Sequence, residues 1–186
     1  MNASWTRRRW LLSVIANGTC MTIARAQDAV GAGDALPERE LELYNTHTRE
    51  SAKVVYRRGE DYVPASLDRL ELLLRDHRSG ESHDMDVKLY DQLFDLATEA
   101  GVAPHYEIIS GYRSPESNAK MAAREGSGVS KKSLHMQGRA VDVRLRSCPT
   151  AKLRDLALAA RRGGVGYYEK SDFVHIDTGA FRTWVG

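Results

Sequence analysis

The stretch Ser133–Val143, "SLHMQGRAVDV", sets a histidine, a glycine and an aspartate into a run of apolar and small residues. After Gly138 the apolar residues alternate with others, which predicts a strand with Val141, Val143 and Leu145 on one face. Asp142 falls on the opposite face of that strand. The stretch therefore combines a core strand with polar side chains that the core does not need.

A second stretch near the C-terminus, "DFVHID", repeats this pattern. With the same period of two, Val174 and Ile176 face the core, while His175 and Asp177 share the opposite face. Two predicted strands thus present polar residues on a face that is not core.

His135, Asp142 and His175 are the candidate metal ligands. Two imidazoles and one carboxylate match the three protein ligands of catalytic zinc sites, which keep a fourth position open. With one carboxylate the site has a net charge of about +1, and the ion can still polarise a carbonyl oxygen. Spacing alone leaves open the alternative that these are satisfied polar side chains at strand ends.

The remaining patterns predict an α+β domain. Strands are expected at 41–47 and 52–58, joined by a turn near 48–50, and at 105–113; helices are expected at 64–78, 86–101 and 150–162, with a further helix starting at Ser114 and Pro115. The predicted core face of the helix at 86–101 consists of Val87, Tyr90, Phe94 and Ala97.

Length and composition predict one soluble domain, since 186 residues with 42% hydrophobic and 28% charged residues suffice for a single core. The first residues, "TRRRWLL" followed by "ARAQ", resemble a twin-arginine signal, so residues 1–26 are predicted to be a signal peptide cleaved after Ala26. A basic amphipathic helix is the alternative. Residues 27–39 are expected to form a flexible leader, and 40–186 the folded domain, which needs no partner to bury its core and is expected to be a monomer.

Removal of the predicted signal reverses the sign of the net charge. Residues 1–26 contain four arginines and no acidic residue, so the formal charge changes from +2 to −2. The apparent basicity belongs to the signal, which argues against nucleic acid as a partner. Cys148 is then the remaining cysteine, and an intrachain disulfide is excluded.

Three ordered blocks carry a resemblance to a known family. "SLHMQGRAVDV" resembles the S-x-H-x-x-G-x-A-x-D pattern of zinc D-Ala-D-Ala metallopeptidases, and "SGYRS" and "GGVGYYEKSDFVHIDTG" resemble two further blocks of the M15-type branch called murein endopeptidase K. The resemblance covers the mature chain. It implies the small α+β fold shared with hedgehog domains, an antiparallel sheet with packed helices.

The resemblance also implies a site and a reaction. One zinc ion would be held by His135, Asp142 and His175, and the protein would hydrolyse peptide cross-links of peptidoglycan stems in the periplasm with a zinc-bound water as nucleophile. Three alternatives remain: a D,D-carboxypeptidase or dipeptidase with the same chemistry, a non-hydrolytic peptidoglycan-binding module, and a structural domain without metal.

The general base has three candidates. Relatives often carry an acid three residues before the second histidine ligand, which corresponds to Asp172. Strand parity instead favours Asp177, because it shares a face with His175. Glu169 is the third candidate.

Two residues are candidates for substrate binding. Arg113 lies in a glycine turn, where its guanidinium could bind a stem-peptide carboxylate or polarise the scissile carbonyl. The alternative is a surface arginine paired with an acid. Ser133 resembles a family serine that holds substrate, although a turn hydroxyl would be equally compatible with its position.

Overall fold

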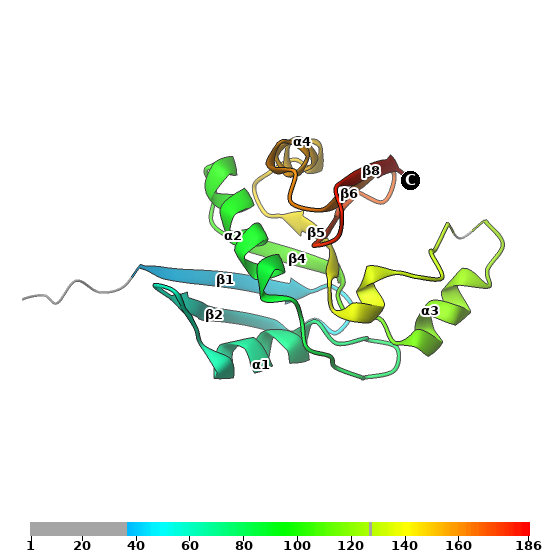
Figure 1. Cartoon of the computed structure of the whole chain (residues 1–186), viewed down its shortest axis with the longest axis horizontal. Coiled ribbons are helices and arrows are strands. Elements are labelled where there is room, and N and C mark those ends of the chain that lie inside the picture. Colours follow the sequence, from blue (N-terminus) through cyan, green and yellow to red (C-terminus); the bar gives the residue numbers. More distant parts are fainter. Residues whose placement is uncertain (1–36, 127) are drawn as a thin grey trace, which may run out of the picture. The chain divides into compact units, whose positions relative to one another are not determined.

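The computed structural model describes residues 37–126 and 128–186, which form one sheet with helices packed against it (Figure 1). The predicted signal peptide, residues 1–26, and residues 27–36 of the predicted leader lie outside the described residues. Within the described part, no helix combines the length and the apolar character needed to cross a membrane.

The sheet has eight strands in the order β3-β2-β1-β4-β5-β7-β6-β8. They are β1 (Glu38–Asn45), β2 (Ser51–Arg58), β3 (Asp61–Tyr62), β4 (His105–Ser110), β5 (Ala140–Leu145), β6 (Gly164–Tyr168), β7 (Phe173–Asp177) and β8 (Arg182–Val185). The helices are α1 (Pro64–Leu73), α2 (Val87–Ala100), α3 (Pro115–Ala122) and α4 (Thr150–Ala160), with a short 3-10 helix, η1 (Leu134–Gln137).

The predicted α+β class is confirmed, and the sheet is mostly antiparallel. Two pairs depart from the antiparallel arrangement, because β1 pairs with β4, and β6 with β8, in parallel. The chain between β1 and β4 contains the β2–β3 hairpin and two helices, and such a long crossover is what a parallel pair requires.

One face of the sheet carries the hydrophobic core. Cross-strand partners such as Val143 and Val174, or Val141 and Ile176, are at most 1% exposed, which confirms the predicted parity of both strands. Helices α1, α2 and α4 pack against the strands, and α2 and α4 also contact each other. The opposite face of β5 and β7 is thereby left for polar side chains.

Several sequence-based boundaries are wrong. Helix α1 ends at Leu73, before the predicted end at 78. Beyond it, the Asp76 carboxylate accepts a hydrogen bond from the Ser114 hydroxyl, on the segment that follows β4. Helix α2 buries Leu89, Leu93 and Leu96 while Val87 and Phe94 are only partly buried. The prediction also missed β3, β6, β8 and η1; β6 is glycine-rich, and glycine is a weak signal for a strand.

Asp76 forms hydrogen bonds that hold Ser114, on the segment that follows β4, in place. Its carboxylate is 1% exposed and accepts hydrogen bonds from the backbone N–H and the hydroxyl of Ser114 at 3.0 and 2.9 Å, and from the Arg78 N–H at 3.0 Å. Burial acts to raise the pKa of Asp76, but the hydrogen bonds from Ser117, Arg78 and Ser114 outweigh it and hold the pKa well below its usual range. Ser114 caps α3, as predicted, by accepting from the Ser117 N–H at 3.2 Å.

Replacing Asp76 with asparagine is expected to lower the free energy of unfolding at pH 7 by about 2–3 kcal/mol, because buried donors lose a charged acceptor. The folded-state pKa is depressed, so this stabilisation is present above the unfolded pKa of about 3.9 and is lost as the pH falls through the folded value. Urea unfolding of the wild type and the variant at pH 7 and pH 3 measures the difference in unfolding free energy and its decrease at low pH. A wild-type-to-variant difference that stays the same at both pH values would contradict this assignment.

Candidate metal centre and substrate pocket

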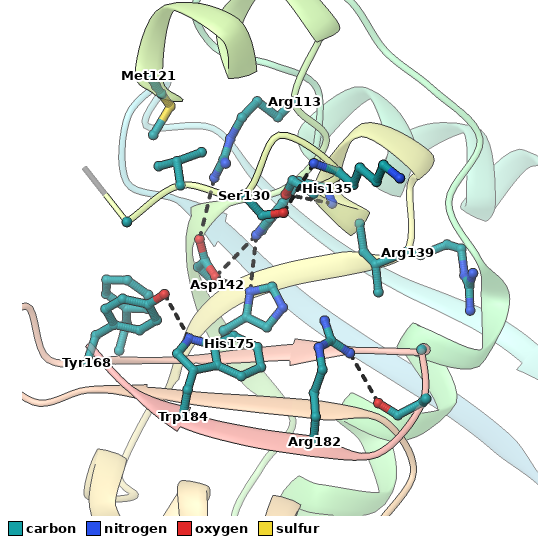
Figure 2. A pocket seen from close by; sticks show the side chains of 18 residues that line it. Arg113, Met121, Ser130, His135, Arg139, Asp142, Tyr168, His175, Arg182 and Trp184 are labelled. Atoms are coloured by element: carbon teal, nitrogen blue, oxygen red, sulfur yellow. Dashed lines mark hydrogen bonds and ion pairs between the residues drawn. The ribbon is translucent and has the colours of Figure 1, made fainter. Parts of the chain in front are cut away.

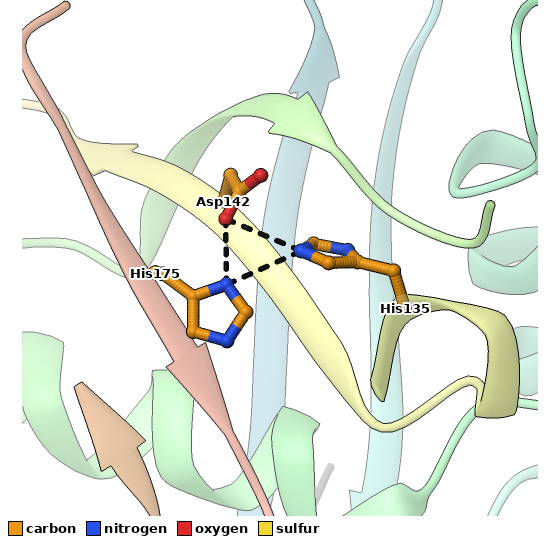
Figure 3. Close-up of side chains that lie close together, drawn as sticks. All are labelled: His135, Asp142 and His175. Carbon is orange, nitrogen blue, oxygen red and sulfur yellow. Dashed lines mark hydrogen bonds and ion pairs between the residues drawn. The ribbon is translucent and has the colours of Figure 1, made fainter. Parts of the chain in front are cut away.

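The polar face of the sheet brings two predicted ligands together through strand register. Asp142 on β5 is paired directly with His175 on β7, and His175 is paired with Gly166 on β6. His135 comes from η1, which precedes β5 and is closed by Gly138 in a left-handed conformation. His135, Asp142 and His175 therefore meet from two strands and a short helix (Figure 3).

The three ligand atoms form a small triangle. Asp142 Oδ1 lies 2.8 Å from His175 Nδ1 and 3.3 Å from His135 Nε2, and the two ring nitrogens are 3.2 Å apart. Tetrahedral ligands at about 2.0–2.1 Å from an ion are about 3.3 Å from one another. The donor atoms are thus already spaced for one small cation.

The other nitrogen of each imidazole has its own acceptor. His135 Nδ1 lies 2.8 Å from the carbonyl oxygen of Gly111, and His175 Nε2 lies 3.1 Å from Asp177 Oδ2. Because these acceptors require an N–H, each neutral ring keeps its lone pair on the nitrogen that faces Asp142. With both rings neutral, two lone pairs and a carboxylate converge at this distance and repel one another unless a proton or a metal cation lies among them.

Burial makes this convergence electrostatically demanding. His135, Asp142 and His175 are at most 7% exposed. Burial acts to lower the pKa of His175, but the hydrogen bonds to Asp142 and Asp177 outweigh it and raise the pKa to about 8. Burial lowers the pKa of His135. The pKa of Asp142 is well below its usual range, because both histidines outweigh the effect of its burial. The site favours positive charge beside an ionised carboxylate.

Arg113 lies beside the ligand group. Its backbone N–H donates to the carbonyl oxygen of His135 at 3.2 Å, and its guanidinium reaches Asn118 Oδ1 at 3.3 Å, Ser110 Oγ at 3.4 Å and Asp142 Oδ2 at 3.9 Å. The side chain is 6% exposed, and its Nε has no hydrogen-bond partner within the described residues. The structure thus places a buried guanidinium cation beside the ligand group.

The ligand group opens into a cavity of about 900 Å³ (Figure 2). Its lining includes four basic side chains, from Arg113, Lys132, Arg139 and Arg182, and the hydroxyl residue Ser133. Asp142 is the single acidic residue among the described residues that line it. A pocket with this charge is suited to a ligand that carries carboxylates.

Comparison with known proteins assigns the chain to a family. The family model described as peptidoglycan L,D-endopeptidase MepK matches residues 34–184. The chain belongs to the MepK family. A probable peptidoglycan L,D-endopeptidase MepK of Haemophilus influenzae is 36% identical over 182 residues, covering 97% of this chain and 96% of the relative. The Escherichia coli K12 peptidoglycan L,D-endopeptidase MepK is 42% identical over 146 residues, 78% of this chain and 80% of the relative. No solved structure gave a significant match.

Within this family fold, the structure places Asp177 behind the ligand group. Asp177 is fully buried; its Oδ1 accepts from the N–H groups of Gly164 and Gly179, both at 2.8 Å, and its Oδ2 accepts from His175 and, at 2.6 Å, from Arg182. The carboxylate contacts the nitrogen of His175 that points away from Asp142. This geometry suits orientation of the imidazole and gives Asp177 no access to the cavity.

Replacing Asp177 with asparagine is expected to weaken metal affinity by about 10- to 100-fold, because the His175 ring loses the anion that fixes its tautomer and orientation. Titration of the metal-free protein against a competing chromophoric chelator measures this change. Asp172→Asn is the matched control and should leave affinity and activity unchanged. Asp172→Asn protein that binds metal but no longer hydrolyses substrate would instead assign the base to Asp172.

The other two base candidates lie apart from the ligand group. Asp172 is 64% exposed at its side chain, accepts from the Thr150 hydroxyl at 2.6 Å and lies 3.5 Å from the Arg144 guanidinium. Its backbone φ of 51° turns the chain just before β7. Glu169 is exposed, and neither residue lines the cavity. Neither Asp172 nor Glu169 is therefore supported as the general base by this geometry.

Ser133 is the N-cap residue of η1, and its hydroxyl accepts a hydrogen bond from the His135 N–H at 3.4 Å. Trp184 and Tyr168 were not among the predicted site residues, yet both line the cavity. Trp184 lies on β8, a strand that the sequence pattern did not reveal. Its ring reaches the site because Gly166 has no side chain: a Cβ there would lie 2.5 Å from the indole.

Proposed function

We propose that this chain is a zinc-dependent endopeptidase that hydrolyses peptide cross-links of peptidoglycan outside the cytoplasmic membrane. Family membership supports the class of reaction and the substrate. The single observation that carries the metal dependence is the triangle of donor atoms from His135, Asp142 and His175, which lie within 4.8 Å of one another at the wall of the cavity.

Zinc is proposed because this borderline-soft ion accepts both imidazole nitrogen and carboxylate oxygen, and the three ligands leave a fourth position free. When bound, zinc would activate water for attack and polarise the amide carbonyl. The chain's own residues hold and orient this group: Gly111 O fixes the ring of His135, and Asp177 fixes the ring of His175.

Arg113 is proposed to bind the substrate. A bond of the L,D type joins the carbonyl of an L-centre to the amine of a D-centre, and that D-centre also carries a carboxyl group. The Arg113 guanidinium lines the cavity 3.9 Å from Asp142, and it can donate to this carboxylate and so place the scissile amide beside the ligand group. Ser133 is proposed as a second polar contact at the cavity rim.

The place of action supports export. Peptidoglycan lies outside the cytoplasmic membrane, so an enzyme that cuts it has to cross that membrane. We propose that residues 1–26 direct this export as a twin-arginine-type signal and that the folded domain acts in the periplasm as a monomer. The leader expected at 27–39 is shortened to end before Glu38, because Glu38 and Arg39 already belong to β1 and pair with β2. The feature that supports the signal is the run Arg7–Arg9 followed by Trp10, Leu11 and Leu12.

Digestion of purified cross-linked muropeptides tests the proposed function. The purified protein is incubated with L,D- and D,D-cross-linked dimers, with and without chelator and added zinc, and products are identified by mass spectrometry. Zinc-restored loss of L,D-linked dimers, absent in His135→Ala protein, is expected. Release of single D-residues from uncross-linked stems with dimers intact would favour a carboxypeptidase, and intact substrates with bound zinc would favour a binding module.

A further inference from the structure

An aromatic wall lies next to the metal ligands on one side of the cavity. It consists of Tyr168 on β6, Phe173 on β7 and Trp184 on β8, all of which line the cavity. The ring centroid of Trp184 is 5.0 Å from that of His175, and its Nε1 is 3.0 Å from the hydroxyl oxygen of Tyr168 (Figure 2). Trp184 therefore contacts both the His175 ring and the Tyr168 hydroxyl.

The direction of the bond between Trp184 and Tyr168 is determined by chemistry. An indole N–H can only donate, so the Tyr168 oxygen is the acceptor. The phenol O–H is then free to donate elsewhere. Among the described residues, the hydroxyl of Tyr168 has a hydrogen bond from Trp184 and none in which its own O–H donates. A tyrosine beside the ligand group thus has an unused donor in the cavity.

The phenol is held rigidly. Its ring stacks on Phe173 with centroids 4.5 Å apart and an interplanar angle of 16°. Gly186 packs against the edge of the same ring, since a Cβ at that position would lie 2.2 Å from it. Trp184 is in turn seated over Gly166, and Arg182 lies 5.2 Å from its ring centroid. Such a donor needs little reorganisation when charge develops near it.

We propose that Tyr168 is a further catalytic residue, whose phenol O–H donates a hydrogen bond to the carbonyl oxygen of the scissile amide. Attack on an amide moves negative charge onto this oxygen, so a fixed neutral donor binds the transition state more tightly than the substrate. The phenol keeps its proton throughout, and no covalent step passes through it. This inference rests on the proposed function, because it assumes amide hydrolysis beside His175.

Arg113 and Tyr168 would then have separate tasks. The Arg113 guanidinium already has Asn118, Ser110 and Asp142 around it, and as a full charge it suits a substrate carboxylate that is ionised before and after the reaction. The neutral phenol is suited to an oxygen that becomes charged only during the reaction. Loss of Arg113 should therefore raise KM strongly, whereas loss of the Tyr168 hydroxyl should act on kcat.

The variant Tyr168→Phe tests the proposal, and Tyr167→Phe is its matched control. Tyr167 is the neighbouring residue on β6; its ring lies under the Arg154 guanidinium at 4.6 Å and does not line the cavity. With a cross-linked muropeptide as substrate, Tyr168→Phe should lower kcat by about 10- to 100-fold and change KM by less than about two-fold. Tyr167→Phe should match the wild type.

Zinc stoichiometry and the melting temperature should be unchanged in Tyr168→Phe, which would exclude loss of the metal or of the fold as the cause. A second variant, Trp184→Phe, removes the indole N–H that orients the phenol and should lower kcat by a smaller factor. An unchanged kcat in Tyr168→Phe, or a change confined to KM, would overturn the proposal. A wild-type protein that does not cleave the substrate would instead refute the proposed function.

Discussion

Replacement of Asp142 with alanine should abolish stoichiometric zinc uptake and lower kcat/KM for a cross-linked muropeptide by at least about 10³-fold. Asp142 is the anionic corner of the donor triangle, 2.8 Å from His175 Nδ1 and 3.3 Å from His135 Nε2. Without it, a cation would have to enter a buried site lined by two neutral rings and the nearby Arg113. Losing several kcal/mol of metal-dependent stabilisation of the transition state accounts for the factor.

Equilibrium dialysis followed by elemental analysis measures the zinc content, and product release by mass spectrometry measures the rate. Asp142→Asn is the informative companion, because it keeps the size of the side chain and a neutral oxygen but removes the charge. It should bind zinc more weakly than the wild type while circular dichroism shows an unchanged fold. Full zinc occupancy and activity in Asp142→Ala would remove Asp142 from the site and leave the strand-end alternative.

Replacement of Arg113 with alanine should lower kcat/KM by about 10²- to 10³-fold, mostly through KM. The guanidinium is 6% exposed, so its full charge acts on a ligand with little screening by water. Arg113→Lys should recover only part of the loss, because an ammonium cannot present two parallel donors. Steady-state kinetics with both variants measures these effects.

A chemically altered substrate separates two tasks for Arg113. If the guanidinium binds the carboxylate next to the scissile bond, a substrate with an amide in that place should be a poor substrate of the wild type. The Arg113→Ala replacement should then lower kcat/KM for the amidated substrate much less than for the natural substrate. Equal losses on both substrates would show that Arg113 acts on the scissile carbonyl instead.

The sequence alone predicted the composition of the candidate metal site and the faces of its strands. Alternation with a period of two set Val141 and Val143 against Asp142, and Val174 and Ile176 against His175, because a strand has two faces and the core takes the apolar one. The candidate ligands were selected from their residue types, from the parity of their strands and from the resemblance of three sequence blocks to a zinc peptidase family, whereas spacing alone left polar strand-end residues as the alternative. Residue type and strand parity are local properties, so they can be predicted from a short stretch of sequence.

Only the tertiary structure decided which polar residues meet and what each contacts. Pairing of β5 with β7 places Asp142 opposite His175, and the parallel pairing of β8 with β6 brings Trp184 over Gly166 to the site. Such register depends on turns and packing far along the chain. The position of an acid near the ligands also depends on distant parts of the chain. Asp177 shares a face with His175, yet it lies behind the His175 ring, because it accepts hydrogen bonds from Gly164, Gly179 and Arg182. Spacing in sequence cannot distinguish a carboxylate that faces a cavity from one that supports its wall, because that difference lies in the direction of a side chain among neighbours from other strands.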